Sequence, residues 1–118
     1  MSELSSAVPL PIAEGINVEV IVGEDTGAAA VTVGRLTAAI EAELPAHRHK
    51  VEEVIYVIAG RVALLRGGES IALATGDGAL TPAGVVHALK NVGEAPAVVI
   101  FIFPAIRVAR DWVASDGW

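Results

Sequence analysis

Residues 44–60 read LPAHRHKVEEVIYVIAG, and this stretch is the strongest indication of the fold. Its second half is rich in Val and Ile up to Gly60, which is typical of a β-strand that ends in a turn. Its first half holds His47 and His49. The 3 histidines of the chain all lie here and in TPAGVVHALKN at residues 81–91, which holds His87. Candidate chemistry is therefore concentrated next to expected strands.

Further short apolar segments on both sides of this stretch also predict strands. Gly67 and Gly68 separate two of them and predict a two-residue hairpin turn. Because no helical segment of about 10–15 residues separates the strands, the sheet should be antiparallel, as in an all-β barrel or sandwich. The expected strands are Ile16–Val22, Ala29–Ala38, Val54–Ala59, Arg61–Arg66, Ser70–Thr75, Val86–Val92 and Ala97–Phe103.

Length and composition predict one domain. The chain has 118 residues, of which 53% are hydrophobic, and this excludes a disordered protein. We expect an N-terminal arm at 1–15, a barrel at 16–106 and a C-terminal tail at 107–118. The tail could form one helical turn with Arg107 and Asp111 four residues apart, and Trp112 and Trp118 should pack on the barrel.

The charge and the apolar runs exclude several classes of partner. The formal charge of -6 disfavours nucleic acids and anionic lipid surfaces. The longest apolar stretch, Ala97–Ile106, is too short to span a membrane and contains Pro104. The chain has no cysteine, which removes disulfides and thiolate metal sites. Since residues 1–15 lack the features of a secretory signal, we expect a soluble, cytoplasmic protein.

Two expected strands, EVIYVIA and VVIFIF, are apolar on both faces. A sheet with one solvated face would alternate apolar and polar residues, so both faces of these strands should be covered. A chain this short cannot easily cover the outside of its own barrel. We therefore expect a homodimer.

If the segment around them is extended, His47 and His49 share one face, because side chains two residues apart then point the same way. Glu53 can share that face, whereas Glu52 is out of phase with it. If a strand brings His87 to the same place, three imidazoles and a carboxylate form a site that suits a divalent first-row metal. The alternative is that these are unrelated polar residues of a strand, and spacing alone leaves the choice open.

The same residues resemble the two sequence motifs of the cupin superfamily, whose members are small antiparallel jelly-roll β-barrels. The first motif, G-x5-H-x-H-x3,4-E-x6-G, is matched by His47, His49, Glu53 and Gly60, but Glu41 replaces its opening glycine. The second, G-x5-P-x-G-x2-H-x3-N, is matched throughout by Gly76, Pro82, Gly84, His87 and Asn91. Asn91 is either a donor to a ligand or a strand-end turn former, and we favour the second interpretation.

The resemblance implies that His47, His49, Glu53 and His87 bind one divalent metal near the mouth of the barrel. Four protein ligands on a six-coordinate metal would leave two adjacent positions for water, substrate or oxygen. A nitrogen and oxygen ligand set suits Fe, Mn, Ni, Cu or Zn. We favour Fe or Mn, because we expect the protein to carry out oxygen chemistry.

The reaction is less constrained than the site, because cupins include dioxygenases, isomerases, decarboxylases, lyases and binding proteins. If all three histidines are ligands, none remains as a general base, so the metal should supply most of the chemistry. We therefore expect a dioxygenase-like enzyme that acts on a small organic molecule. The alternatives are a metal-dependent lyase, decarboxylase or isomerase, and a non-catalytic module that binds a small ligand or a metal.

Several other polar residues could contribute, with orientations that the sequence leaves open. Arg35 or Arg66 could anchor a substrate carboxylate if they point inward, although exposed arginines usually pair with nearby acids. Tyr56 is out of phase with Glu53 and should point away from the metal. The remaining candidate acid-base groups are Glu41, Glu43, Glu52 and Lys90.

Overall fold

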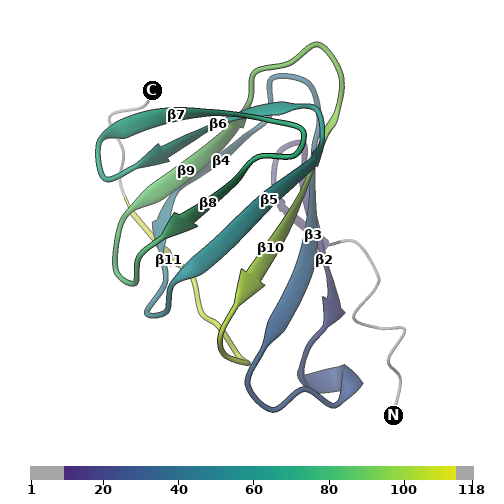
Figure 1. The fold of residues 1–118 in the computed structure, drawn as a ribbon, viewed down its shortest axis with the longest axis vertical. Coiled ribbons are helices and arrows are strands. Elements are labelled where there is room, and N and C mark those ends of the chain that lie inside the picture. The colour runs from purple at the N-terminus through teal and green to yellow at the C-terminus, as the bar shows by residue number, and fades with distance from the viewer. Residues whose placement is uncertain (1–9, 114–118) are drawn as a thin grey trace.

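The chain folds into two antiparallel β-sheets that face each other, in a computed structural model that describes residues 10–113 (Figure 1). This architecture is an antiparallel jelly-roll barrel and confirms the all-β prediction. The helical element of the described residues is a three-residue 3-10 turn, η2 (Glu24–Thr26). Within residues 10–113, no helix has the length and apolar character that a membrane crossing requires.

The first sheet has six strands in the order β1-β2-β3-β10-β5-β8, and the second has five in the order β11-β4-β9-β6-β7. The six-stranded sheet consists of β1 (Leu10–Ala13), β2 (Ile16–Val22), β3 (Thr32–Ala38), β10 (Ala97–Phe103), β5 (Glu53–Ala59) and β8 (Gly78–Thr81). The five-stranded sheet consists of β11 (Asp111–Trp112), β4 (Glu43–Arg48), β9 (His87–Asn91), β6 (Arg61–Arg66) and β7 (Glu69–Ala74).

The hydrophobic core lies between the sheets and follows the alternation of side chains along the strands. In β5 and β10, every second residue is buried. Val57 on β5, Val62 on β6 and Val99 on β10 are almost fully inaccessible to solvent. Because successive side chains on a strand point to opposite faces, the other set of residues on β5 and β10 faces outward.

The hairpin predicted at Gly67 and Gly68 joins β6 to β7. Both glycines have positive φ, 55° and 91°. A two-residue turn of this handedness matches the twist of the flanking strands, and glycine adopts it without a steric cost. The register of the two strands is regular from Arg61 opposite Ala74 to Arg66 opposite Glu69.

The structure adds strands that the periodicity did not predict, namely β1, β4, β8 and β11. The segment β4 has the sequence ELPAHR, whose proline and charged residues hide its strand character. The expected strand at Ala29–Ala38 begins only at Thr32, because the preceding residues form a bend after η2.

The helical turn expected between Arg107 and Asp111 is wrong. Arg107 instead forms an ion pair with Glu24, the first residue of η2. Asp111 and Trp112 form β11, which pairs with Arg48 and His47 at the edge of β4. The edge of the sheet supplies backbone partners that an isolated turn lacks, so the tail becomes a strand. Trp118 lies outside the described residues.

Candidate metal centre

The four predicted ligands lie at neighbouring strand ends of the two sheets. His47 is near the end of β4 and stands opposite His87, the first residue of β9. His49 follows β4 by one residue, and Glu53 is the first residue of β5. All four side chains are buried, whereas Glu52 is exposed, as expected. The reason differs from the expected strand parity, because a bend at residues 50–51 separates β4 from β5 and the two strands lie in different sheets.

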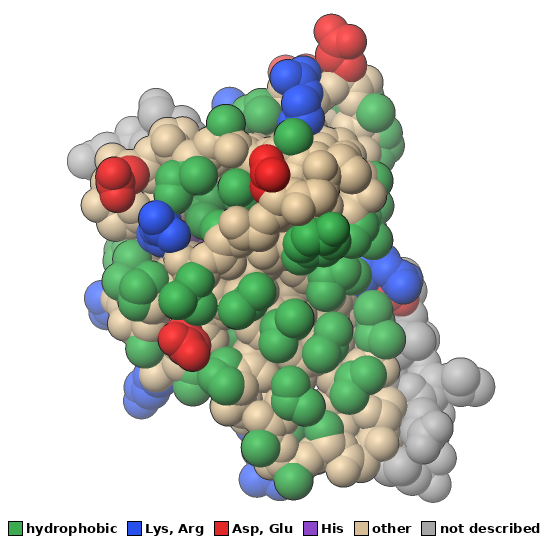
Figure 2. Space-filling view, in the orientation of Figure 1, with side chains coloured by type: hydrophobic (Ala, Val, Ile, Leu, Met, Phe, Trp, Pro, Cys, Tyr) green, Lys and Arg blue, Asp and Glu red, His purple; other side chains and the backbone are tan. Residues whose placement is uncertain are grey.

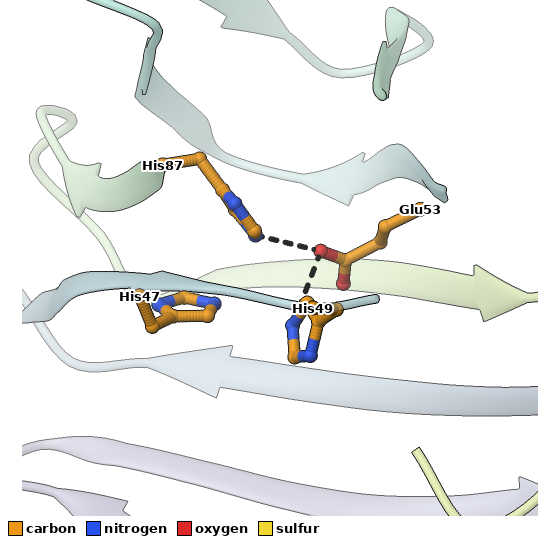
Figure 3. A group of neighbouring side chains, drawn as sticks. All are labelled: His47, His49, Glu53 and His87. Atoms are coloured by element: carbon orange, nitrogen blue, oxygen red, sulfur yellow. Dashed lines mark hydrogen bonds and ion pairs between the residues drawn. The ribbon is translucent and has the colours of Figure 1, made fainter. Parts of the chain in front are cut away.

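The functional atoms of these side chains converge on one point (Figure 3). His87 Nε2 lies 2.9 Å from Glu53 Oε1, and His49 Nε2 lies 3.8 Å from the same oxygen. One candidate ligand atom from each of the four residues lies within 4.8 Å of every other. Two ligands that each lie about 2.1 Å from a shared ion are at most about 4.2 Å apart. The four side chains would therefore move only slightly closer together to bind one ion.

Backbone carbonyls fix the orientation of all three imidazoles. His47 Nδ1 lies 2.7 Å from the carbonyl oxygen of Pro45. His49 Nδ1 lies 2.8 Å from that of Ala109, and His87 Nδ1 lies 3.0 Å from that of Val85. A carbonyl only accepts hydrogen bonds, so each Nδ1 carries the proton and donates it. The Nε2 lone pairs are therefore left to face the centre, which is the arrangement that metal-binding histidines need.

Burial keeps the site in the protonation state that suits a cation. It lowers the pKa of His47 to about 3, against the opposing effect of the hydrogen bond to Pro45. Burial also lowers the pKa of His49. Both rings are then neutral at pH 7, and the buried His49 Nε2 has no hydrogen-bond partner among the described residues. A buried lone pair without a donor is costly, and a metal ion at the centre would satisfy it.

The contact between His87 and Glu53 leads to the same conclusion. His87 donates its Nδ1 proton to Val85, so Nε2 presents a lone pair to the carboxylate. Two lone pairs at 2.9 Å require either a proton or another cation between them. The donor set therefore fits one divalent transition metal.

A model of the cupin domain matches residues 34–103, which is more than half of the chain and includes all four residues. The chain belongs to the cupin family. A search of curated proteins found no match to the sequence. This cupin nevertheless departs from the motif at Glu41, which adopts a left-handed φ of 66° at the place of the opening glycine. The turn is thus kept with a non-glycine residue, which strains the backbone locally.

Solved structures share the fold at low sequence identity. The polyketide cyclase RemF from Streptomyces resistomycificus has a TM-score of 0.77 at 19% identity, over 90% of this chain and 76% of its own. A point mutant of the Bacillus subtilis oxalate decarboxylase OxdC has a TM-score of 0.81 at 20% identity, over 90% and 30%. A point mutant of salicylate 1,2-dioxygenase from Pseudoaminobacter salicylatoxidans, in complex with gentisate, has a TM-score of 0.71 at 20% identity, over 81% and 27%.

An inner cavity of this cupin is lined by three of the four residues of the centre, and an outer groove adjoins it. The inner one, about 30 Å³, lies between the sheets and is lined by His47, Glu53 and His87 together with apolar core residues. Its other polar lining residues in the described chain are Thr81 and Arg110. The outer groove, about 420 Å³, shares three lining residues with the inner cavity, namely Val18, Phe101 and Arg110.

The remaining sequence candidates lie away from this cavity. Arg35 forms an ion pair with Glu19, and Arg66 donates to the carbonyl of Leu80. Tyr56 is exposed, as its parity predicted. Asn91 is buried and binds backbone groups at its strand end, in agreement with the turn-forming interpretation. The sequence also offered four acid-base groups, and none of them lines the inner cavity. They are Glu41, Glu43, Glu52 and Lys90.

Sequence reasoning missed Arg110 and the role of its neighbours. The carbonyl of Ala109 accepts the proton of His49, and the ring of Trp112 lies edge-on to His47 at 5.6 Å. The tail segment therefore covers one side of the histidine cluster. The only signal for this in the sequence is the mixture of Arg, Asp and Trp at 110–112, which also fits a solvated tail.

Proposed function

We propose that His47, His49, Glu53 and His87 bind one divalent transition metal, with Fe or Mn favoured and Zn, Ni or Cu also compatible with the ligands. The support is the convergence of three imidazole Nε2 atoms and one carboxylate in a buried site. The backbone carbonyls at Nδ1 hold the rings in place before the ion arrives, which reduces the entropy lost on binding.

Glu53→Gln is expected to lower the metal content per chain strongly, whereas Glu52→Gln is expected to leave it nearly unchanged. The two residues are adjacent, but Glu53 faces the histidines and Glu52 is exposed. The amide removes the negative charge that offsets the ion while keeping the size of the side chain. Elemental analysis of the two variants beside wild type makes the measurement. Equal loss in both variants, or loss only in Glu52→Gln, would overturn the assignment.

We further propose that the protein is a metal-dependent dioxygenase that acts on a small organic molecule. The observation that supports this is the composition of the inner cavity, in which no titratable group other than the ligands and Arg110 lines the wall of the described chain. An arginine stays protonated and cannot act as a general base at neutral pH. A bound metal would supply the chemistry, by redox activation of oxygen or as a Lewis acid.

The protein residues then act by positioning and by exclusion of water. Leu36, Leu64 and Val99 line the inner cavity, and their apolar side chains keep the local dielectric low. The Nδ1 hydrogen bonds hold the imidazoles rigid during turnover. The similarity to salicylate 1,2-dioxygenase favours oxygen chemistry, whereas the similarities to a cyclase and a decarboxylase keep the non-oxidative alternative.

Oxygen uptake distinguishes these functions. Protein loaded with Fe(II) or Mn(II) is incubated with a panel of small enols, phenols and thiols, and oxygen consumption is followed with His87→Ala as the control. We expect substrate-dependent uptake that the variant loses. Product formed at the same rate without oxygen would instead establish a lyase, decarboxylase or isomerase. Ligand-dependent thermal stabilisation without any product would establish a binding module.

We also propose that the protein is a homodimer joined through the outer face of the six-stranded sheet. Apolar side chains gather on this face (Figure 2). Cross-strand pairing places them side by side on β5, β8 and β10. These residues carry no charge, so two copies with a net charge of -6 each can meet there without direct repulsion. The apolar face consists of Val54, Tyr56, Ile58, Leu80, Ile100 and Ile102.

Light scattering at micromolar concentration is expected to give twice the 12.1 kDa mass of one chain. Tyr56→Glu places a charge at the centre of the apolar face and should shift the protein toward the monomer, because burying an unpaired carboxylate is costly. Glu52→Gln is the control, since it alters the same segment outside the apolar face. A monomeric wild type would rule out the dimer.

A further inference from the structure

Arg110 is held at the mouth of the barrel by its neighbours on both sides. The carbonyl of Ala109 accepts the Nδ1 proton of His49 at 2.8 Å. Asp111 and Trp112 pair with the edge of β4, opposite Arg48 and His47. The position of the Arg110 backbone is therefore tied to the same strand that carries His47 and leads into His49.

The side chain of Arg110 extends from this point into the cavity system. It lines both the inner cavity and the outer groove. One face of the guanidinium lies near the ring of Trp112, with Cζ at 5.3 Å from the ring centroid, so the aromatic ring restricts its position. Arg110 therefore lies where the outer groove adjoins the inner cavity that three of the four proposed ligands line.

Arg110 differs from three of the other five arginines in that the described residues give it no acidic partner at close range, although the charge of Glu53 acts on it from further away. Arg35, Arg48 and Arg107 each have a carboxylate oxygen within 4.0 Å. Among the described residues, no carboxylate oxygen comes that close to Arg110, and its buried Nε has no hydrogen-bond partner. A buried donor without an acceptor is costly, and a guanidinium presents its donors as a planar fork that matches a carboxylate.

The charge of the site also favours an anion. Imidazoles bind a metal in their neutral form, so a divalent metal with Glu53 and Arg110 would leave an excess of two positive charges in a poorly hydrated cavity. Neutralisation of that excess by the substrate strengthens binding much more there than in water. The chain as a whole is acidic, so this positive centre is a local feature and not a consequence of composition.

We propose that Arg110 binds the carboxylate of the substrate, and that the substrate class is small carboxylates with an apolar body. This inference rests on the metal-dependent function proposed above. The carboxylate pairs with the guanidinium fork at the junction of the two cavities. The apolar body packs against Phe101, Phe103 and Val108, which line the outer groove. Arg110 and Val108 lie outside residues 34–103, whereas Phe101 and Phe103 lie inside them, so the group that would bind the carboxylate comes from the tail of this chain and not from the segment that matches the family model.

The test measures binding and needs no turnover. Acetate, pyruvate and benzoate are titrated calorimetrically into Mn(II)-loaded protein, each beside its neutral amide, in a buffer free of carboxylate and phosphate. We expect at least one carboxylate to bind wild type about tenfold or more tightly than its amide, since hydrogen bonds to charged groups contribute that much. Arg110→Gln should lose this preference, and Arg110→Lys should restore part of it because the charge returns without the fork.

Arg35→Gln is the matched control, because Arg35 is already paired with Glu19 on the outer surface and should not affect binding. The titrations are repeated with metal-free protein, and metal content is measured for every variant. A wild type without metal would contradict the proposed function, while the metal-free titrations would still test Arg110. Carboxylate binding that is unchanged in Arg110→Gln, or absent from wild type in both forms, would overturn the proposal.

Discussion

His87→Ala protein, purified without a chelating tag, is expected to carry less than about a tenth of the metal found in wild type, with the fold retained. Loss of a residue that only orients a ligand already costs about 10- to 100-fold in metal affinity. Loss of one of the four proposed ligands should cost more than that. Elemental analysis gives the metal per chain, and circular dichroism reports the β structure.

The fold should survive because the ring of His87 is a small part of the barrel's packing. The strand β9 pairs with both β4 and β6, and its Ala88 and Leu89 remain in the core. The change removes the hydrogen bond to Val85 and leaves Glu53 without its partner, at a cost of about 1–3 kcal/mol.

His49→Ala provides an independent form of the same experiment. It leaves the contact between His87 and Glu53 in place, so it disturbs the buried carboxylate less. We expect the same loss of metal with a smaller loss of stability. If both variants keep the metal content of wild type, the ion does not bind at the histidine cluster and the proposed site is wrong. Unfolding of both variants would mean that the ion is part of the fold, and a chelator would then unfold wild type as well.

The fold and the histidine cluster were predictable because each depends on local patterns. Strand periodicity and paired turn glycines identify β6 and β7 with no knowledge of the partner strands. The parity of His47 and His49 places them on one face, and the motif spacing adds Glu53 and His87. Glu53 lies in β5 of the opposite sheet, so its place beside the histidines depends on the turn between β4 and β5 and not on strand parity. The structure brings these four side chains together as predicted.

The features that remained unpredicted depend on long-range contacts. The two residues of β11 become a strand only because the edge of β4 is there to pair with them. Arg110 enters the site for the same reason, since its neighbours are anchored to β4 and to His49. A segment of two or three residues is too short to show a periodicity, so the tail gives no sign of its position. Arg35 and Arg66, which the sequence offered as anchors, are each engaged elsewhere.

Gly34→Ala is expected to destabilise the protein by about 3 kcal/mol or more, although alanine usually stabilises a strand relative to glycine by about 0.5–1 kcal/mol. Gly34 lies in the middle of β3, opposite Phe101 on β10. A Cβ at this position would lie 2.0 Å from Cζ of the Phe101 ring, well inside van der Waals contact. The ring therefore occupies the space that any side chain at position 34 would need.

Gly93→Ala is the matched control. The nearest atoms to an added Cβ lie at 3.5 Å there, which is ordinary contact, so stability should stay within about 1 kcal/mol of wild type. Urea unfolding of both variants gives the two free energies. A double variant, Gly34→Ala with Phe101→Leu, removes the ring that causes the clash and should recover at least about 1 kcal/mol relative to the sum of the single changes.

The same clash connects stability to the cavity system. Phe101 lines both the inner cavity and the outer groove, so a ring displaced by the added methyl group must move toward one of them. Gly34→Ala should then weaken binding of the carboxylate probe in the fraction that stays folded, while its metal content remains at the wild-type level because no ligand has moved. Stability equal to wild type would show that the ring can leave Gly34 without cost. If the free energy of the double variant equals the sum of the two single changes, the destabilisation does not come from contact with the Phe101 ring.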